Sequence, residues 1–197
     1  MSEENVKTAP TLWWVRHGPT HAKTMVGWSD IPADLSDAAK VARLAVALPD
    51  DTPVISSDLA RTVATADALA GDRPRLPHGP DLREMHFGAW ELRAFAEIEA
   101  EDPAHITAFW SEPGEVRPPG GESWNDLTQR VNRAVDRLLA RDEDIIIIAH
   151  FGVILTQIQR VTGISTEVAF GHRIEPLSLT TLRYGTKPQA LGINHEP

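Results

Sequence analysis

The sequence contains no cysteine, one tyrosine and three methionines, and none of its apolar runs is long. Without cysteine the chain can form no disulfide bond, thiol nucleophile or thiolate metal site. No apolar stretch approaches the roughly 20 residues that a membrane-spanning helix needs. The start, "MSEENVKTAP", is polar and acidic and lacks the basic and then apolar segments of a secretory signal. We therefore expect a cytoplasmic protein without a membrane span.

Positive charge is also scarce. Lysine and arginine number 19 against 28 aspartate and glutamate residues, which gives a formal net charge of −9. Such a surface repels nucleic acids and anionic lipids, so neither is an expected partner. A local cluster of arginine and histidine is informative in this chain, because any anion site has to form against the overall negative field. The sequence is compatible with a monomer and with a homodimer.

A chain of 197 residues, of which 42% are apolar and 24% charged, fits a single globular domain. We find no internal repeat and no long linker, so the predicted domain spans residues 1–197, with its core roughly at 11–195. Hydrophobic periodicity predicts strands at 11–15, 52–57, 144–149, 177–185 and 190–194, the last two suited to a hairpin. It predicts helices at 35–48, 58–70, 92–103, 104–110, 122–140 and 151–163.

The alternation of strands and helices indicates an α/β fold. The β-branched run "DIIIIA" at 144–149 is typical of a central strand that is covered on both faces. We therefore predict a three-layer sandwich, with helices on both faces of a mostly parallel sheet. Ser36 and Asp58 are the expected N-caps of the first two helices, and Ser123 with Asp126 forms a capping-box pattern.

Polar side chains directly follow three of the predicted strands. Ligands bind parallel α/β sheets at the carboxyl ends of the strands. The residues that this rule places at one edge are Arg16, His17, Ser57, Asp58, Arg61 and His150. Two arginines and two histidines from three separate segments therefore converge there. Ser57 and Asp58 are better explained as strand-end and cap residues than as catalysts.

This group of side chains suits phosphoryl chemistry. Two fixed guanidiniums bind a phosphate dianion through bidentate hydrogen bonds, and the helix N-terminus near Phe151 adds N–H donors. A neutral imidazole can attack phosphorus and form a covalent intermediate, while a second imidazole donates to the phosphoryl oxygens. The leaving alkoxide needs a proton, which Glu84 or Glu91 in "LREMHFGAWE" could supply. Arginine and histidine already supply positive charge, so we expect neither a metal nor another cofactor.

Five motifs resemble, in order and spacing, those of the histidine phosphatase superfamily, the phosphoglycerate-mutase-like family. They are "RHGPT", "SSDLARTVATA", "LREMHFGAWE", "PPGGESWNDLTQRV" and "AHFGVI", and the likeness covers roughly residues 11–165. The resemblance implies His17 as the phosphorylated nucleophile and Glu84 as the proton donor. It assigns the phosphate pocket to Arg16, Arg61 and His150. It also implies an antiparallel edge strand in the sheet.

The activity implied by this resemblance is hydrolysis of a phosphomonoester through a phosphohistidine, without a metal. "FGAWE" resembles the phosphatase branch of the family, which includes α-ribazole-phosphate phosphatases and small sugar-phosphate phosphatases. The expected partner is therefore a small phosphorylated metabolite such as α-ribazole 5′-phosphate or a sugar phosphate. Three alternatives stay open. The first is a phosphoglycerate-type mutase with the same site, and the second is a non-catalytic protein that binds phosphorylated ligands. The third is an enzyme that acts on phosphohistidine or phosphoprotein substrates.

Substrate specificity is expected to depend on a rim that the family motifs do not specify. The rim candidates, together with Thr20 as a candidate phosphate contact, are His21, Lys23, His86 and Phe151. Lys23 stands where phosphatases of this group commonly carry asparagine, and Phe151 replaces a glycine of the usual HGG. The segment 72–122 is expected to cover the site, and Trp28 and Trp90 are candidates for lining it.

Overall fold

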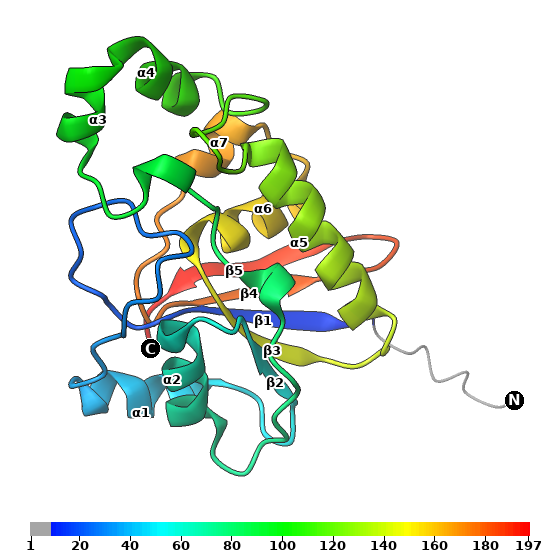
Figure 1. Ribbon diagram of the computed structural model, residues 1–197. Helices are drawn as coiled ribbons and strands as arrows, with labels where there is room; N and C mark the ends of the chain where they lie inside the picture. The colour runs from blue at the N-terminus through cyan, green and yellow to red at the C-terminus, as the bar shows by residue number, and fades with distance from the viewer. Residues whose placement is uncertain (1–8) are drawn as a thin grey trace, which may run out of the picture.

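A five-stranded sheet forms the middle layer of the molecule, as a computed structural model of the chain shows (Figure 1). The structure describes residues 9–197, so most of the N-terminal stretch in which we expect no secretory signal lies outside the described residues. The strands are β1 (Thr11–Arg16), β2 (Val54–Ser56), β3 (Ile145–Ala149), β4 (Leu179–Arg183) and β5 (Gln189–His195). Their order across the sheet is β2-β3-β1-β4-β5.

The sheet is parallel on one side and antiparallel on the other. β3 pairs in parallel with both β1 and β2. β4 pairs antiparallel with β1, and β5 pairs antiparallel with β4 to form the expected hairpin. The predicted fold class, with its parallel centre and antiparallel edge, is thereby confirmed.

Helices lie on both faces of the sheet (Figure 1). They are α1 (Ala38–Ala47), α2 (Ala60–Ala70), α3 (Phe95–Glu101), α4 (Pro103–Ser111), α5 (Trp124–Leu139), α6 (Phe151–Thr162) and α7 (Thr166–Phe170). Two short 3-10 helices are η1 (Pro80–Leu82) and η2 (Gly88–Trp90). Sequence reasoning did not find α7 or the 3-10 helices, because elements of three to five residues carry too little periodicity.

The side chains of β3 show why the three layers form. Ile146 and Ile148 belong to the core cluster that includes side chains of α1 and α2. Ile145 and Ile147 belong to the cluster formed with α5 and α6. All four isoleucines are fully buried, because successive side chains of a strand point to opposite faces and both faces are covered.

Two helix starts differ from the prediction. The N-cap of α1 is Asp37, whose side chain accepts a hydrogen bond from the backbone N–H of Lys40, so Ser36 lies one residue outside the cap. α2 begins after Leu59 and has no side-chain cap. Asp58 cannot cap it, because its carboxylate forms a bidentate ion pair with Arg83 at 2.7 and 2.6 Å. A partner distant in the sequence has replaced the local backbone donors.

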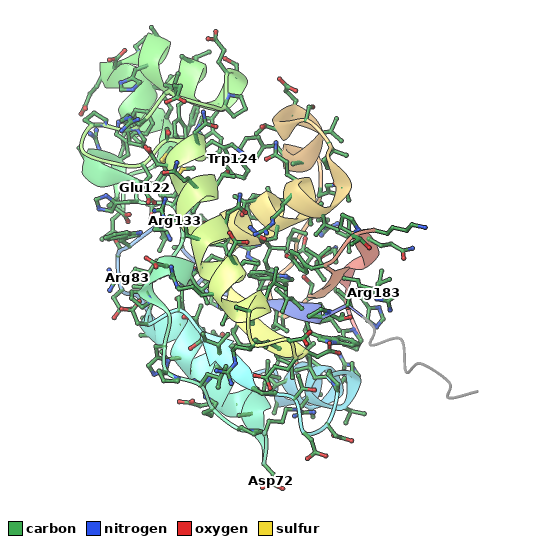
Figure 2. The ribbon with its side chains drawn as sticks, turned by 90° about the vertical axis from the view of Figure 1, so that its right-hand side faces the viewer. Asp72, Arg83, Glu122, Trp124, Arg133 and Arg183 are labelled. Atoms are coloured by element: carbon green, nitrogen blue, oxygen red, sulfur yellow. The ribbon has the colours of Figure 1, made fainter. Side chains whose placement is uncertain are left out.

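The capping box of α5 is confirmed. Ser123 Oγ accepts from the N–H of Asp126, and the Asp126 carboxylate accepts from the N–H of Ser123. Trp124, the first residue of the helix, is buried and lies at the upper end of α5 in Figure 2. The start of α5 lies beside α7 (Figure 1), where the ring centroids of Trp124 and Phe170 are 4.7 Å apart.

The segment 72–122 carries η1, η2, α3 and α4. None of the helices within residues 9–197 is both long and apolar enough to cross a membrane. In the same part of the chain, no group of three or more histidine, aspartate or glutamate side chains could hold a metal ion.

Candidate active site

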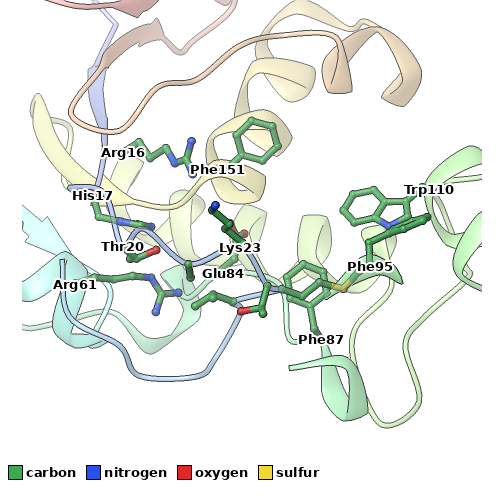
Figure 3. Close-up of a pocket in the computed structure, with 14 residues that line it drawn as sticks. Arg16, His17, Thr20, Lys23, Arg61, Glu84, Phe87, Phe95, Trp110 and Phe151 are labelled. Atoms are coloured by element: carbon green, nitrogen blue, oxygen red, sulfur yellow. The ribbon is translucent and has the colours of Figure 1, made fainter. Parts of the chain in front are cut away.

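A cavity of about 390 Å³ opens beside the carboxyl end of β1 and the N-terminus of α6 (Figure 3). This is the edge of the sheet where parallel α/β folds bind their ligands. Most of the predicted site residues lie on its wall, which consists of Arg16, His17, Thr20, Ala22, Lys23, Thr24, Met25, Val26, Arg61, Glu84, Phe87, Phe95, Trp110 and Phe151.

His17 follows β1 directly and is buried. Its Nδ1 lies 2.7 Å from the carbonyl oxygen of Gly18, and since a carbonyl only accepts, Nδ1 carries the proton. Nε2 then keeps its lone pair. Burial, followed by the positive charge of Arg61, lowers the pKa of His17 to about 3. The ring is therefore neutral near pH 7 and has a free nitrogen that can act as a nucleophile.

His150 follows β3 and lies against His17. The two rings meet edge to face, with centroids 5.1 Å apart. The two histidines therefore share one site, although His150 is fully buried and does not belong to the cavity wall. Burial, with the neighbouring His17 and Arg61, lowers the pKa of His150 well below its usual value. Both imidazoles are thus neutral in the free protein.

A chain of hydroxyl groups orients the ring of His150. Thr62 Oγ1 lies 2.8 Å from the carbonyl oxygen of Leu59 and 2.6 Å from Ser57 Oγ, and either hydroxyl can donate in the shorter contact. Ser57 Oγ in turn lies 2.8 Å from Nε2 of His150, and when Ser57 donates to Nε2, the ring proton is on Nδ1. Nδ1 of His150 is buried without a partner among residues 9–197. Ser57 thus orients a site histidine, a role that sequence reasoning missed.

Arg16 is the last residue of β1. Its Nη1 donates to the carbonyl of Ile174 at 2.6 Å, and its guanidinium carbon lies 5.4 Å from the centre of the Phe151 ring. Its Nε is buried and has no partner in the described part of the chain. Burial lowers the pKa of Arg16, but an arginine in a protein stays charged. A fixed cation with an unsatisfied donor favours an anion as its ligand.

Arg61 belongs to the first turn of α2, and its guanidinium is bound by the backbone of the loop at residues 27–29. Nη1 and Nη2 donate to the carbonyls of Ser29 and Gly27, at 2.9 and 2.6 Å. Glu91 holds the same loop, because its carboxylate accepts from the N–H groups of Gly27, Trp28 and Ser29. Burial would raise the pKa of Glu91, but these hydrogen bonds and that of the Ser29 hydroxyl lower it. Glu91 is therefore a support for Arg61.

Glu84 is the one of the two candidate proton donors that lies on the cavity wall. Its Oε1 accepts from the N–H of Met85 and its Oε2 from the N–H of Gly152, each at 3.0 Å. Each carboxyl oxygen keeps a second lone pair, so the side chain can carry a proton without losing either bond. Figure 3 shows Glu84 between the arginines and the aromatic side chains of the cavity.

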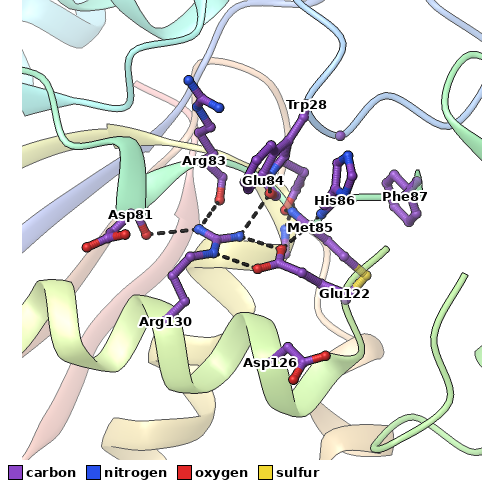
Figure 4. Close-up of polar contacts among 12 residues, drawn as sticks. Trp28, Asp81, Arg83, Glu84, Met85, His86, Phe87, Glu122, Asp126 and Arg130 are labelled. Atoms are coloured by element: carbon purple, nitrogen blue, oxygen red, sulfur yellow. Dashed lines mark hydrogen bonds and ion pairs between the residues drawn. The ribbon is translucent and has the colours of Figure 1, made fainter. Parts of the chain in front are cut away.

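The backbone that carries Glu84 is fixed from behind by Arg130 of α5 (Figure 4). The Arg130 guanidinium donates to the carbonyls of Asp81, Arg83 and Glu84 at 2.9 to 3.1 Å. It also forms a bidentate ion pair with Glu122 at 2.7 and 2.6 Å. The guanidinium therefore binds the backbone of residues 81–84 and the side chain of Glu122, and these bonds hold Glu84 in a fixed position.

Residues 12–194 match the family model described as the histidine phosphatase superfamily, branch 1. The chain belongs to this family. It is 30% identical over 174 residues to the adenosylcobalamin/alpha-ribazole phosphatase of Escherichia coli K12, which covers 83% of this chain and 85% of the relative. It is 32% identical to the glucosyl-3-phosphoglycerate phosphatase of Mycolicibacterium vanbaalenii, over 79% of this chain and 76% of the relative.

A solved structure shows the same architecture as this histidine phosphatase. The alpha-ribazole phosphatase of Shigella flexneri superimposes with a TM-score of 0.82 at 27% identity. The likeness covers 94% of this chain and 96% of that chain. The residues matched by the family model, 12–194, include the site and the segment 72–122.

Four residues that the sequence suggested for the rim or lining of the histidine phosphatase site lie off the cavity wall. His21 pairs with Asp34 at 2.8 Å in a separate depression, because an exposed carboxylate is within its reach. His86 lies against Trp28, with ring centroids 4.6 Å apart. Trp28 Nε1 donates to the backbone carbonyl of Glu84 at 2.8 Å, so its ring supports the site from behind. Trp90 is buried in the core.

Sequence reasoning missed two aromatic residues of the wall, Phe95 and Trp110. Phe95 begins α3, and Trp110 lies in the last turn of α4. Both side chains are exposed, although large apolar residues normally point inward. Aromatic residues on two short predicted helices could have suggested a ligand contact. No local sequence pattern, however, shows that these helices approach the cavity.

Proposed function

We propose that this chain hydrolyses phosphomonoesters of small metabolites through a phosphohistidine at His17. The observation that carries the proposal is a neutral, buried imidazole on the wall of one cavity with two guanidiniums, those of Arg16 and Arg61. The guanidiniums bind the phosphoryl dianion. His150 and Thr20 are the further contacts that we assign to its oxygens. The scheme uses no metal or other cofactor.

In the first half-reaction, Nε2 of His17 attacks phosphorus in line with the ester oxygen. The N–P bond forms as the P–O bond to the alcohol breaks. The protonated carboxyl of Glu84 gives its proton to the departing oxygen, so the alcohol leaves neutral and Glu84 becomes a carboxylate. The hydrogen bond from Nδ1 of His17 to the Gly18 carbonyl orients the ring and supports the positive charge that the ring acquires.

In the second half-reaction, water attacks the phosphohistidine. The Glu84 carboxylate takes a proton from the water as the new P–O bond forms and the N–P bond breaks. Inorganic phosphate leaves, and His17 returns to its neutral state with Glu84 protonated for the next cycle. The same carboxyl group therefore acts first as an acid and then as a base.

Phosphatase activity on small phosphorylated metabolites agrees with the family and with the names of the two curated relatives. By that likeness, α-ribazole 5′-phosphate and a sugar phosphate are the candidate substrates. Lys23 and Phe151 lie on the cavity wall, where they can contact the alcohol part of either one. We assign the protein to the cytoplasm, as its sequence suggests.

The proton-donor role of Glu84 is tested by two substrates with different leaving groups. A p-nitrophenolate leaves without a proton, whereas a propoxide requires one. We expect Glu84→Gln to lower kcat/KM for propyl phosphate by roughly 10²- to 10³-fold, and for p-nitrophenyl phosphate by less than about tenfold. Steady-state phosphate release from both esters measures the difference.

The matched control for this substitution is Glu99→Gln, which removes an exposed carboxylate of α3 that does not line the cavity. Both kcat/KM values of that variant are expected to equal those of the wild type. Equal losses on the two esters in Glu84→Gln would show that Glu84 does not protonate the leaving group.

A methyl group at Gly152 is expected to displace this proton donor. A Cβ at Gly152 would lie 2.6 Å from Glu84 Oε1 and 3.3 Å from Leu127 Cδ2. The end of the Glu84 side chain can swing away, so the fold tolerates the methyl group while the carboxyl leaves its place. We expect Gly152→Ala to lower kcat for propyl phosphate by about 10²-fold with little change in Tm.

Gly192→Ala is the matched control, because a Cβ at that position of β5 would meet no atom within 4 Å. Its kcat is expected to match the wild type. A wild-type kcat in Gly152→Ala as well would mean that catalysis does not depend on the place of the Glu84 carboxyl beside residue 152.

A further inference from the structure

The cavity of this site has two chemically different halves. One half holds the charged residues assigned above to the phosphate, on the left in Figure 3. The other half is aromatic, and its side chains, which we call the aromatic wall, are Phe87, Phe95, Trp110 and Phe151. Glu84 lies between the halves (Figure 3). An alcohol group that leaves beside Glu84 therefore extends onto aromatic surface.

A second, smaller cavity of about 50 Å³ continues from the aromatic wall. It shares Glu84, Phe87, Trp110 and Phe151 with the main cavity. The rest of its lining is apolar and consists of Met85, Phe109, Trp124, Gly152 and Phe170. Such a lining suits an apolar group, whereas a sugar hydroxyl placed there would lose its hydrogen bonds to water.

Two members of the aromatic wall are exposed to solvent. Phe95 is 44% and Trp110 is 42% exposed, and the other exposed large apolar side chains of residues 9–197 are aliphatic. Trp110 is held from behind by Phe109 and Phe170, whose ring centroids lie 5.0 and 6.3 Å away. When a flat ligand covers an aromatic ring that is exposed to solvent, the contact removes apolar surface from water and stabilises the complex.

Charge argues against an acidic group in the aromatic half. The cations of the cavity wall are Arg16 and Arg61, which bind the phosphate, and the exposed Lys23. No pair of arginines remains on that wall for a second acidic group, such as the carboxylate of a phosphoglycerate. The aromatic half is therefore suited to an uncharged group.

We propose that the phosphomonoester taken by this site carries a planar aromatic ring on its alcohol, and that this ring stacks on Trp110 and Phe95. The proposal rests on the proposed function, because it places the phosphoryl group at His17 and the ester oxygen at Glu84. Phe151, which lies over Arg16, joins the phosphate half to the ring half. The ring contributes to the binding of the substrate, and it leaves the site with the alcohol product.

Three esters that share an alkanol leaving group isolate the contribution of the ring. They are propyl, 2-cyclohexylethyl and 2-(2-naphthyl)ethyl phosphate. We expect the naphthyl ester to exceed the propyl ester in kcat/KM by about 30-fold, and the cyclohexyl ester by about fivefold. The corresponding phosphonates have no scissile P–O ester bond, so calorimetric titration with them measures binding without turnover.

Trp110→Ala and Phe95→Ala remove the stacking surface, and because both side chains are exposed the fold is expected to persist. Trp110→Ala is expected to weaken naphthyl phosphonate binding about tenfold and to leave propyl phosphonate binding within twofold. Leu191→Ala on β5 is the matched control, since Leu191 is also 42% exposed and lies outside the cavity wall. It is expected to bind all three phosphonates as the wild type does.

The two proposals fail in distinguishable ways. If propyl phosphate is hydrolysed but the naphthyl compounds gain nothing, or lose equally in Trp110→Ala and Leu191→Ala, the aromatic proposal is overturned and the hydrolase stands. If the naphthyl phosphonate binds selectively through Trp110 but no ester releases phosphate, the aromatic proposal is supported and the hydrolase is overturned.

Discussion

Replacing His17 by asparagine is expected to lower kcat for any phosphomonoester by roughly 10⁴-fold or more. The reason is that the substitution removes the nitrogen that forms the covalent bond to phosphorus, and no other described residue can take its place. His150 lies against the same ring but is not on the cavity wall, and its Nε2 is hydrogen-bonded to Ser57. Phosphate release by purified His17→Asn at saturating substrate measures the loss.

His78→Asn is the control for this substitution. His78 is an exposed histidine, hydrogen-bonded to Ser56 at 3.1 Å, that lines a separate depression. Its replacement is expected to leave kcat unchanged. A His17→Asn protein that kept more than about a hundredth of the wild-type kcat would have another nucleophile, and the catalytic scheme above would be wrong.

Arg61→Ala is expected to lower kcat/KM by roughly 10²- to 10³-fold. The guanidinium is buried beside His17, and its loss removes charge stabilisation that is needed most in the transition state. Arg61→Lys is not expected to restore activity. A single ammonium cannot reproduce the two bonds to Ser29 and Gly27 and still present a planar group to the phosphate.

Arg73→Ala separates this effect from a loss of stability. Arg73 also donates to several backbone carbonyls, among them those of Pro49 and Leu48, but it lies outside the cavity wall. Its replacement is expected to lower Tm and to leave kcat/KM unchanged at a temperature where the protein is folded. If Arg73→Ala lost as much kcat/KM as Arg61→Ala, the losses of both variants would be explained by unfolding.

Much of the fold could be predicted because its central strands carry a strong local signal. The four isoleucines of β3 are buried on both faces, and this requires helices above and below the sheet. Helix starts were less predictable, because tertiary contacts compete with local caps. Asp58 shows this most clearly, since its ion pair with Arg83 replaces the expected cap.

The charged half of the site could be predicted because its residues directly follow strands whose ends meet at one edge. Glu84 and Glu91 could not be told apart by local reasoning, since both are carboxylates of one irregular segment. Their roles differ only through distant partners, Gly152 for Glu84 and the loop at Gly27 for Glu91. Phe95 and Trp110 of the aromatic wall were missed for the same reason, because α3 and α4 reach the cavity only through the tertiary fold.

The phosphohistidine at His17 is tested most directly by trapping it. A rapid alkaline quench during hydrolysis of p-nitrophenyl [³²P]phosphate, followed by peptide mapping, locates any label on the protein. We predict an acid-labile label on His17 that is absent from His17→Asn and that decays in water alone at the rate of turnover. An unlabelled enzyme during turnover, or a label on a residue other than His17, would contradict the mechanism. A label that persists until a phosphate acceptor other than water is added would identify a mutase instead.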